Sequence, residues 1–109
     1  MSHTRPDKGV AGAVARTVSA AAVMGQGVGD RSRGVFGWGT GSDGIGVQGA
    51  ATDGVGGIFE GSKANITLRP IPGETHPDPG TTGDLLVDST GRLWFCRASG
   101  NPATWVQLA

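Results

Sequence analysis

A short motif, in which a hydrophobic residue and one variable residue precede a glycine, recurs every twelve residues between positions 23 and 61 of this chain. The motif begins at Val23, Val35, Val47 and Phe59, and its glycines are spaced in the same way. A fixed period indicates one small structural unit repeated along the chain, and each unit needs a neighbour to bury its apolar side. The repeat therefore favours a fibrous or prism-like β structure over a catalytic globule.

The composition is poor in bulky apolar side chains and rich in glycine. The chain has 21 glycines among 109 residues, no tyrosine and 17% charged residues. Ordering so much glycine costs backbone entropy, which sparse apolar burial does little to offset. Because the formal net charge is +0 and the valines recur regularly, we expect oligomerisation rather than disorder.

Three copies of the chain are the expected assembly. Twelve residues are too few for one turn of a single-chain β-helix with a filled interior, and no disulfide is available to compensate, since Cys96 is the only cysteine. Three chains wound around one axis can instead share layers of short strands. The residues expected in this trimer core are Val23, Val35, Val47 and Phe59.

Changes in composition divide the chain into four segments. Residues 1–21 form an N-terminal arm and attachment segment, where valines four apart slightly favour a short helix over an irregular first turn of the repeat. Residues 22–69 form the glycine-rich stalk, with a strand expected at 62–69. Residues 70–83 hold four prolines and three glycines, which is typical of a linker.

The last segment, residues 84–109, is expected to form a small C-terminal β cap. Two apolar runs flank Asp88-Ser89-Thr90-Gly91, which fits a hairpin turn with Gly91 in the left-handed region. A second turn at 99–102 leads to a third apolar run at 104–108. The pattern predicts a three-stranded antiparallel meander, with Cys96 as a half-buried thiol.

Charge and hydropathy disfavour several partners. A net charge of +0 without a basic patch argues against nucleic acid and against electrostatic attachment to membranes. No run of 18 apolar residues is present, so no membrane span is expected. Glycines and polar residues interrupt the apolar stretch near the N-terminus, which disfavours a signal peptide and favours synthesis in the cytoplasm.

No catalytic, cofactor or metal site is expected. Residues 39–44 match a dinucleotide-binding fingerprint, but a glycine-rich repeat produces that match by chance. His3 and His76, the only histidines, are expected to be solvated. The acidic residues are scattered, and those at Asp84 and Asp88 fit turn positions. We therefore expect a protein that is not an enzyme.

Three tryptophans are the candidates for a recognition surface: Trp38, Trp94 and Trp105. Exposed indole rings stack on sugars or anchor protein contacts. The alternative for Trp94 and Trp105, and the favoured one, is that they pack together as the small core of the cap. Trp38 lies between two glycines, where it either packs against another chain or is exposed as a contact.

The stalk and cap together resemble trimeric bacteriophage tail-fibre and tail-spike proteins and their phage-derived bacterial relatives. The resemblance covers roughly residues 22–109. It is carried by Gly34-Val35-Phe36-Gly37, by Gly44-Ile45-Gly46-Val47-Gln48-Gly49, by the stretch from Gly83 to Cys96 and by the run from Pro102 to Leu108. It implies an intertwined three-chain β-helix whose tip often carries host or glycan recognition. Full fibres are far longer than this chain.

These observations predict a structural and adhesive subunit of a phage or phage-like particle, such as a fibre, a spike or a tip. The expected partners are two further copies of the chain, a particle attachment protein bound through residues 1–21, and a cell-surface glycan. The protein would be part of a virion and extracellular after release. Three alternatives stay open: a capsid or particle decoration protein, a small stand-alone carbohydrate-binding module, and a glycan-cleaving spike.

Overall fold

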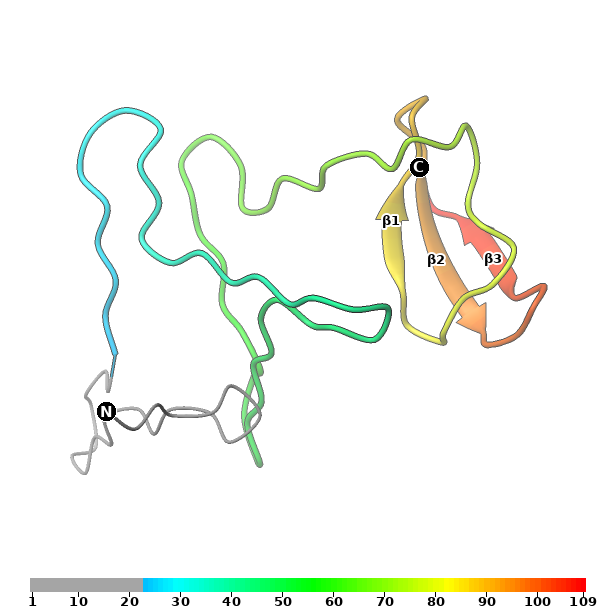
Figure 1. Ribbon diagram of the computed structural model, residues 1–109, viewed down its shortest axis with the longest axis horizontal. Helices are drawn as coiled ribbons and strands as arrows, with labels where there is room; N and C mark the ends of the chain where they lie inside the picture. The colour runs from blue at the N-terminus through cyan, green and yellow to red at the C-terminus, as the bar shows by residue number, and fades with distance from the viewer. Residues whose placement is uncertain (1–22) are drawn as a thin grey trace, which may run out of the picture. The chain divides into compact units, whose positions relative to one another are not determined.

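A computed structural model describes residues 23–109 (Figure 1). The chain divides into two compact units, Met1–Asp53 and Gly54–Ala109. The described part contains three β-strands and no helix, which confirms the expected mainly β class. The attachment segment at 1–21 and its short helix lie outside the described residues.

The first unit contains two similar turns, twelve residues apart, which differ at their third residue, where Arg31 has a positive φ of 61° and Asp43 does not. Gly29 and Gly41 both have a positive φ, 103° and 91° respectively. The amide of Ser32 donates to the carbonyl oxygen of Gly29 (3.4 Å), and the amide of Gly44 donates to that of Gly41 (3.1 Å). The sequence period is thus also a period of backbone geometry, because glycine takes left-handed conformations without steric cost.

Close backbone contacts recur with the same spacing. A Cβ atom on Gly25 would collide with the carbonyl oxygen of Gly34, and one on Gly37 would collide with that of Gly46. The second contact repeats the first, with both of its glycines twelve residues further along the chain. Successive passes of the chain therefore approach each other at glycines, where the missing side chain leaves room for the neighbouring backbone.

The glycine-rich region forms no β-strand in the single chain. Residues 23–84 contain turns, bends and one isolated bridge at Gly80, so the strand expected at 62–69 is wrong for the chain by itself. Between described residues of 23–69, the backbone–backbone hydrogen bonds are the two turn bonds of the first unit. A strand requires a partner whose amides and carbonyls face it, and these close approaches do not align such groups.

The second unit ends in a three-stranded antiparallel sheet, as expected. Its strands are β1 (Leu85–Val87), β2 (Leu93–Ala98) and β3 (Thr104–Gln107), in the spatial order β1-β2-β3. The β1–β2 turn closes with a bond from the Gly91 amide to the Asp88 carbonyl oxygen (3.0 Å). The φ of Gly91 is 92°, which confirms its expected left-handed conformation.

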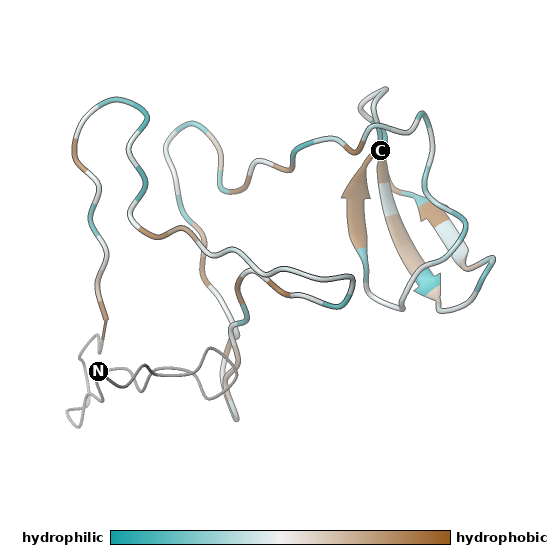
Figure 2. Cartoon of the chain, in the orientation of Figure 1, coloured by the Kyte–Doolittle hydropathy of each residue, from teal (hydrophilic) through white to brown (hydrophobic). Residues whose placement is uncertain are grey.

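The pairing register gives the sheet two different faces. Leu85, Phe95 and Val106 are directly opposite one another across the three strands, and Val87 is opposite Leu93. Because side chains alternate between faces, the residues between these lie on the other side. We call the first side the outer face; its residues are Leu85, Val87, Leu93, Phe95, Val106 and, just after β3, Leu108. In Figure 2, β1 is largely brown and β2 partly brown, which marks the hydrophobic residues of these two strands without distinguishing the faces.

The other side, which we call the inner face, carries Leu86, Trp94, Cys96 and Trp105. Residues 70–83, expected as a linker, pack on the sheet from its β1 edge onward. The Ile71 amide donates to the Val87 carbonyl oxygen (2.8 Å), and Gly80 exchanges two 3.1 Å bonds with Gly100. In Figure 1 this segment crosses in front of the sheet. It therefore supplies the cover that a three-stranded sheet needs to form a core.

Candidate functional site

The four residues expected in a trimer core are all exposed in the single chain. The exposed fractions are 72% for Val23, 72% for Val35, 74% for Val47 and 63% for Phe59. Each has a neighbouring glycine two positions later, so the adjacent backbone offers no side chain to cover it. The repeat thus presents these four apolar side chains to solvent, and the residues between them add further exposed ones: Met24, Val28, Phe36, Ile45, Val55 and Ile58. A stacked or intertwined partner would bury such a surface.

Trp38 is among the most exposed large side chains described, at 81%. Its neighbours Gly37 and Gly39 both press against another pass of the chain, since a Cβ on Gly39 would lie 2.6 Å from the Ile45 carbonyl oxygen. The two glycines allow the backbone on either side of Trp38 to lie close to the neighbouring stretch at Ile45 and Gly46. The indole ring is left in solvent, where it is accessible to a ligand or a partner.

Trp94 and Trp105 are half-buried on the inner face, and both contact His76. The ring centroids of His76 and Trp105 are 5.2 Å apart with planes 17° from parallel, and His76 meets Trp94 edge-on at 4.7 Å. These distances are typical of stabilising aromatic pairs. The two tryptophans therefore belong to a three-ring cluster within the cap, and their contact with His76 limits how much ring surface a glycan could reach.

The expectation that His76 is solvated is wrong. The ring is half-buried between two tryptophans, and its Nδ1 atom is 2.8 Å from the Pro77 carbonyl oxygen. The prolines around it suggested an exposed linker, whereas this segment lies across the inner face. An aromatic residue in a short polar loop beside a tryptophan-containing sheet is the signal that could have indicated this contact.

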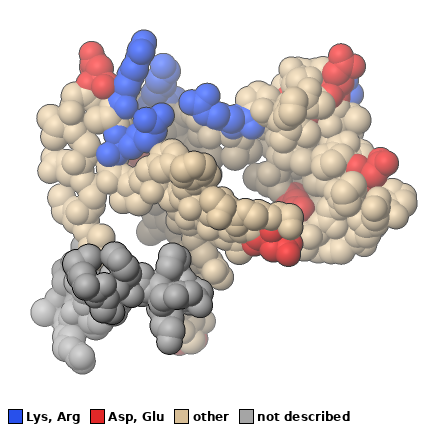
Figure 3. Space-filling model, viewed as in Figure 1, with Lys and Arg blue, Asp and Glu red and all other residues tan. Residues whose placement is uncertain are grey.

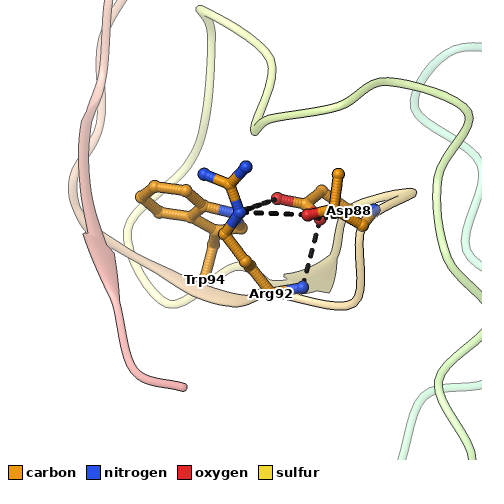
Figure 4. A network of polar contacts seen from close by, with 4 residues as sticks. Asp88, Arg92 and Trp94 are labelled. Carbon is orange, nitrogen blue, oxygen red and sulfur yellow. Dashed lines mark hydrogen bonds and ion pairs between the residues drawn. The ribbon is translucent and has the colours of Figure 1, made fainter.

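Asp88 is the centre of the polar network in the cap, and it is fully buried (Figure 4). Its Oδ1 atom accepts hydrogen bonds from the Thr90 amide (2.8 Å), the Thr90 hydroxyl (2.6 Å) and the Arg92 amide (3.1 Å). Its Oδ2 atom accepts one from the Trp94 indole N–H (2.8 Å). The sequence predicted the turn position of Asp88 but not this bond to Trp94, which joins the turn to the aromatic cluster.

The environment of Asp88 keeps it ionised. Burial raises the pKa of its carboxyl group, but the Thr90 hydroxyl, the Trp94 indole and the amides of Arg92 and Thr90 together hold the pKa well below its usual range. The Arg92 side chain adds a looser ion pair, with Nε 3.8 Å from Oδ2. All these donors are committed to one carboxylate, so Asp88 is a structural group rather than a candidate acid or base.

The described residues offer no other arrangement of reactive groups. No cluster of three or more His, Cys, Asp or Glu side chains that could hold a metal occurs within 23–109. Cys96 is fully buried, and its thiol lies 3.4 Å from the Ala98 carbonyl oxygen. On the face drawn in Figure 3, uncharged surface predominates and the charged side chains stand in small groups. No membrane-spanning helix is found among these residues.

Comparison with other proteins adds no family. No protein-family model matches the chain, and neither the curated proteins nor the solved structures give a significant match. The functional argument therefore depends on the repeat, on Trp38 and on the two faces of the cap.

Proposed function

We propose that this chain is a structural and adhesive subunit of a phage or phage-like particle, assembled as a homotrimer. The observation that carries the proposal is the shared twelve-residue period of the turns, of the glycine contacts and of the exposed Val35 and Val47. A repeat that leaves the same apolar side chain uncovered in each unit needs a partner with the same period. Another copy of the chain is the simplest such partner.

The unpaired backbone of 23–69 supports the same proposal. Among the described residues, its amides and carbonyls have few backbone partners, which would leave them available for strand pairing between chains. In an intertwined trimer, Val23, Val35, Val47 and Phe59 would fill successive layers around the axis. The glycines would permit the close approach of three backbones, as collagen illustrates for a different helix.

The adhesive part of the proposal depends on Trp38. Trp38 is an exposed indole between two glycines. A trimer would carry three copies of it around its axis, which would give three identical weak contacts. Multivalent presentation raises the apparent affinity for a repetitive surface such as a cell-surface glycan. Residues 1–21 would hold the trimer on the particle.

The first test is the mass of the full chain in solution, measured by light scattering before and after heating in mild detergent. We expect a heat-resistant mass near three times the 10.9 kDa of one chain. Binding of this trimer to bacterial surface polysaccharides on a glycan array would then be compared with that of Trp38→Ala. A folded monomer would overturn the trimer, and equal glycan binding by Trp38→Ala would remove the assigned adhesive residue.

A further inference from the structure

We infer that the outer face of the C-terminal sheet is a contact surface between copies of this chain, an inference that rests on the proposed homotrimer. The face consists of two cross-strand rows, and each row has one residue from each of the three strands or, for Leu108, from just after β3. Leu85, Phe95 and Val106 form one row, and Val87, Leu93 and Leu108 form the other. All six are apolar, and none of the six is buried.

The chain uses its own residues to cover the inner face. His76 stacks on Trp105 and meets Trp94 edge-on. Gly80 lies so close that a Cβ on it would come within 2.6 Å of the Trp105 ring. On the outer face, by contrast, Leu85 is 51% exposed and Leu108 is 55% exposed. One sheet face is thus covered by residues 70–83, while the other leaves Leu85 and Leu108 exposed and its remaining four residues half-buried.

The size of the outer face indicates what can occupy it. Three strands about 5 Å apart and two rows about 7 Å apart make a patch of roughly 100–200 Å², allowing for side-chain width. A stable interface between separate proteins buries about 800 Å² per partner. The outer face is therefore too small to capture an independent protein by itself.

A second and a third copy of the chain do not need a large face. Copies already held together through the repeat would present their caps to one another at a high effective concentration, so a small apolar contact suffices. The six side chains carry no charge, which allows identical faces to meet without repulsion or an unpaired buried ion. Contact at this face would fix the register of the three chains.

Cysteine cross-linking on the full-length protein tests the inference. Leu85→Cys and Leu108→Cys place a thiol on the outer face, while Gln107→Cys places one at an exposed position on the opposite side of the same sheet. The native Cys96 is buried, so the unmodified chain controls for background reaction. Copper-catalysed air oxidation, in which oxygen takes the two electrons and no linker has to enter the interface, should join copies of Leu108→Cys into disulfide-linked dimers. These dimers would be seen on a non-reducing denaturing gel, and Gln107→Cys should not form them.

A second readout keeps the inference separate from the proposed function. Because an interface core excludes solvent, a monofunctional maleimide should label Leu108→Cys at least about tenfold more slowly than Gln107→Cys. If the mass is trimeric but both cysteines react alike and neither cross-links, the outer face is not an interface while the proposed function stands. A monomeric unmodified chain would overturn the proposed function and this inference with it.

Discussion

At the scale of single residues, the cap depends on Asp88 and Gly80, whose contacts no other residue type can reproduce. Asp88 is a buried carboxylate that four donors from three residues satisfy. Gly80 is where the backbone of the covering segment lies against Trp105 and Cys96 of the inner face. Neither residue belongs to the repeat, so changes at these positions report on the cap.

Replacing Asp88 by asparagine should destabilise the cap, because the amide group must point an N–H donor at another donor. We expect Tm to fall by on the order of 5–10 °C in thermal unfolding followed by circular dichroism. The control is Asp84→Asn, since the Asp84 carboxylate is exposed and accepts one bond, from the Thr81 amide. Equal Tm changes for the two variants would contradict the special role of Asp88.

The same carboxylate predicts how stability depends on pH. Its pKa in the folded chain lies below its ordinary value of 3.8. The ionised group therefore stabilises the fold above about pH 4, and this contribution is lost as pH falls towards the folded pKa. Tryptophan fluorescence melts should show Tm dropping between about pH 4 and pH 2 in the native protein and dropping less in Asp88→Asn. If Tm fell equally steeply with falling pH in both proteins, the effect would belong to other titrating groups.

Gly80→Ala should be costly because the added methyl group meets the Trp105 ring and the Cys96 sulfur. Overpacking of this kind costs about 1–3 kcal/mol in free energy of unfolding. The matched control is Gly73→Ala in the same segment, where the nearest atom, the Thr75 carbonyl oxygen, lies 3.3 Å away. Urea denaturation of both variants measures the difference, and a Gly80→Ala chain as stable as the control would show that the segment can shift away.

At the scale of elements, the twelve-residue unit is defined by where glycine is required and why. Gly25 and Gly37 are required by space, because another pass of backbone occupies the position of a Cβ atom. Gly29 and Gly41 have a positive φ but open surroundings. The two kinds of glycine should respond differently to substitution, although the sequence alone does not distinguish them.

Gly37→Ala should therefore impair the repeat more than Gly41→Asn does. The alanine methyl would overlap the Gly46 carbonyl oxygen, whereas asparagine tolerates left-handed φ and finds nothing within 4 Å of its Cβ atom. We expect Gly37→Ala to lose heat resistance of the assembled protein, at roughly 1–3 kcal/mol per copy, and Gly41→Asn to retain it. Thermal unfolding of both proteins at equal concentration gives the comparison, and the reverse order would contradict the close approach.

At the scale of the whole molecule, the described residues keep many apolar side chains exposed. The described core contains two fully buried residues, Cys96 and Asp88, and one of these is charged. Val23, Val35 and Val47 of the repeat are exposed, and so are Leu85 and Leu108 of the outer face. Each set is explained if the functional unit is an assembly of several chains.

Val47→Asp tests this dependence on assembly. In a trimer it would bring three carboxylates together near the axis, which desolvation and repulsion make unfavourable. We expect the mass measured by light scattering to fall from the trimer value to that of one chain. Gln48→Asp adds the same charge one position along and should leave the trimer intact. Loss of assembly in both variants would indicate a general charge effect instead.

The sequence by itself determined the period, the mainly β class, the three-stranded cap and the left-handed Gly91, because these depend on spacing and local backbone preference. Tertiary structure alone decided the burial of His76, the bond from Trp94 to Asp88 and the fit of Gly80 against Trp105. Those contacts join residues whose positions depend on how residues 70–83 cross the sheet, and no local pattern encodes that path. The strand expected at 62–69 is wrong for a different reason, since a strand needs a pairing partner and the described residues supply none.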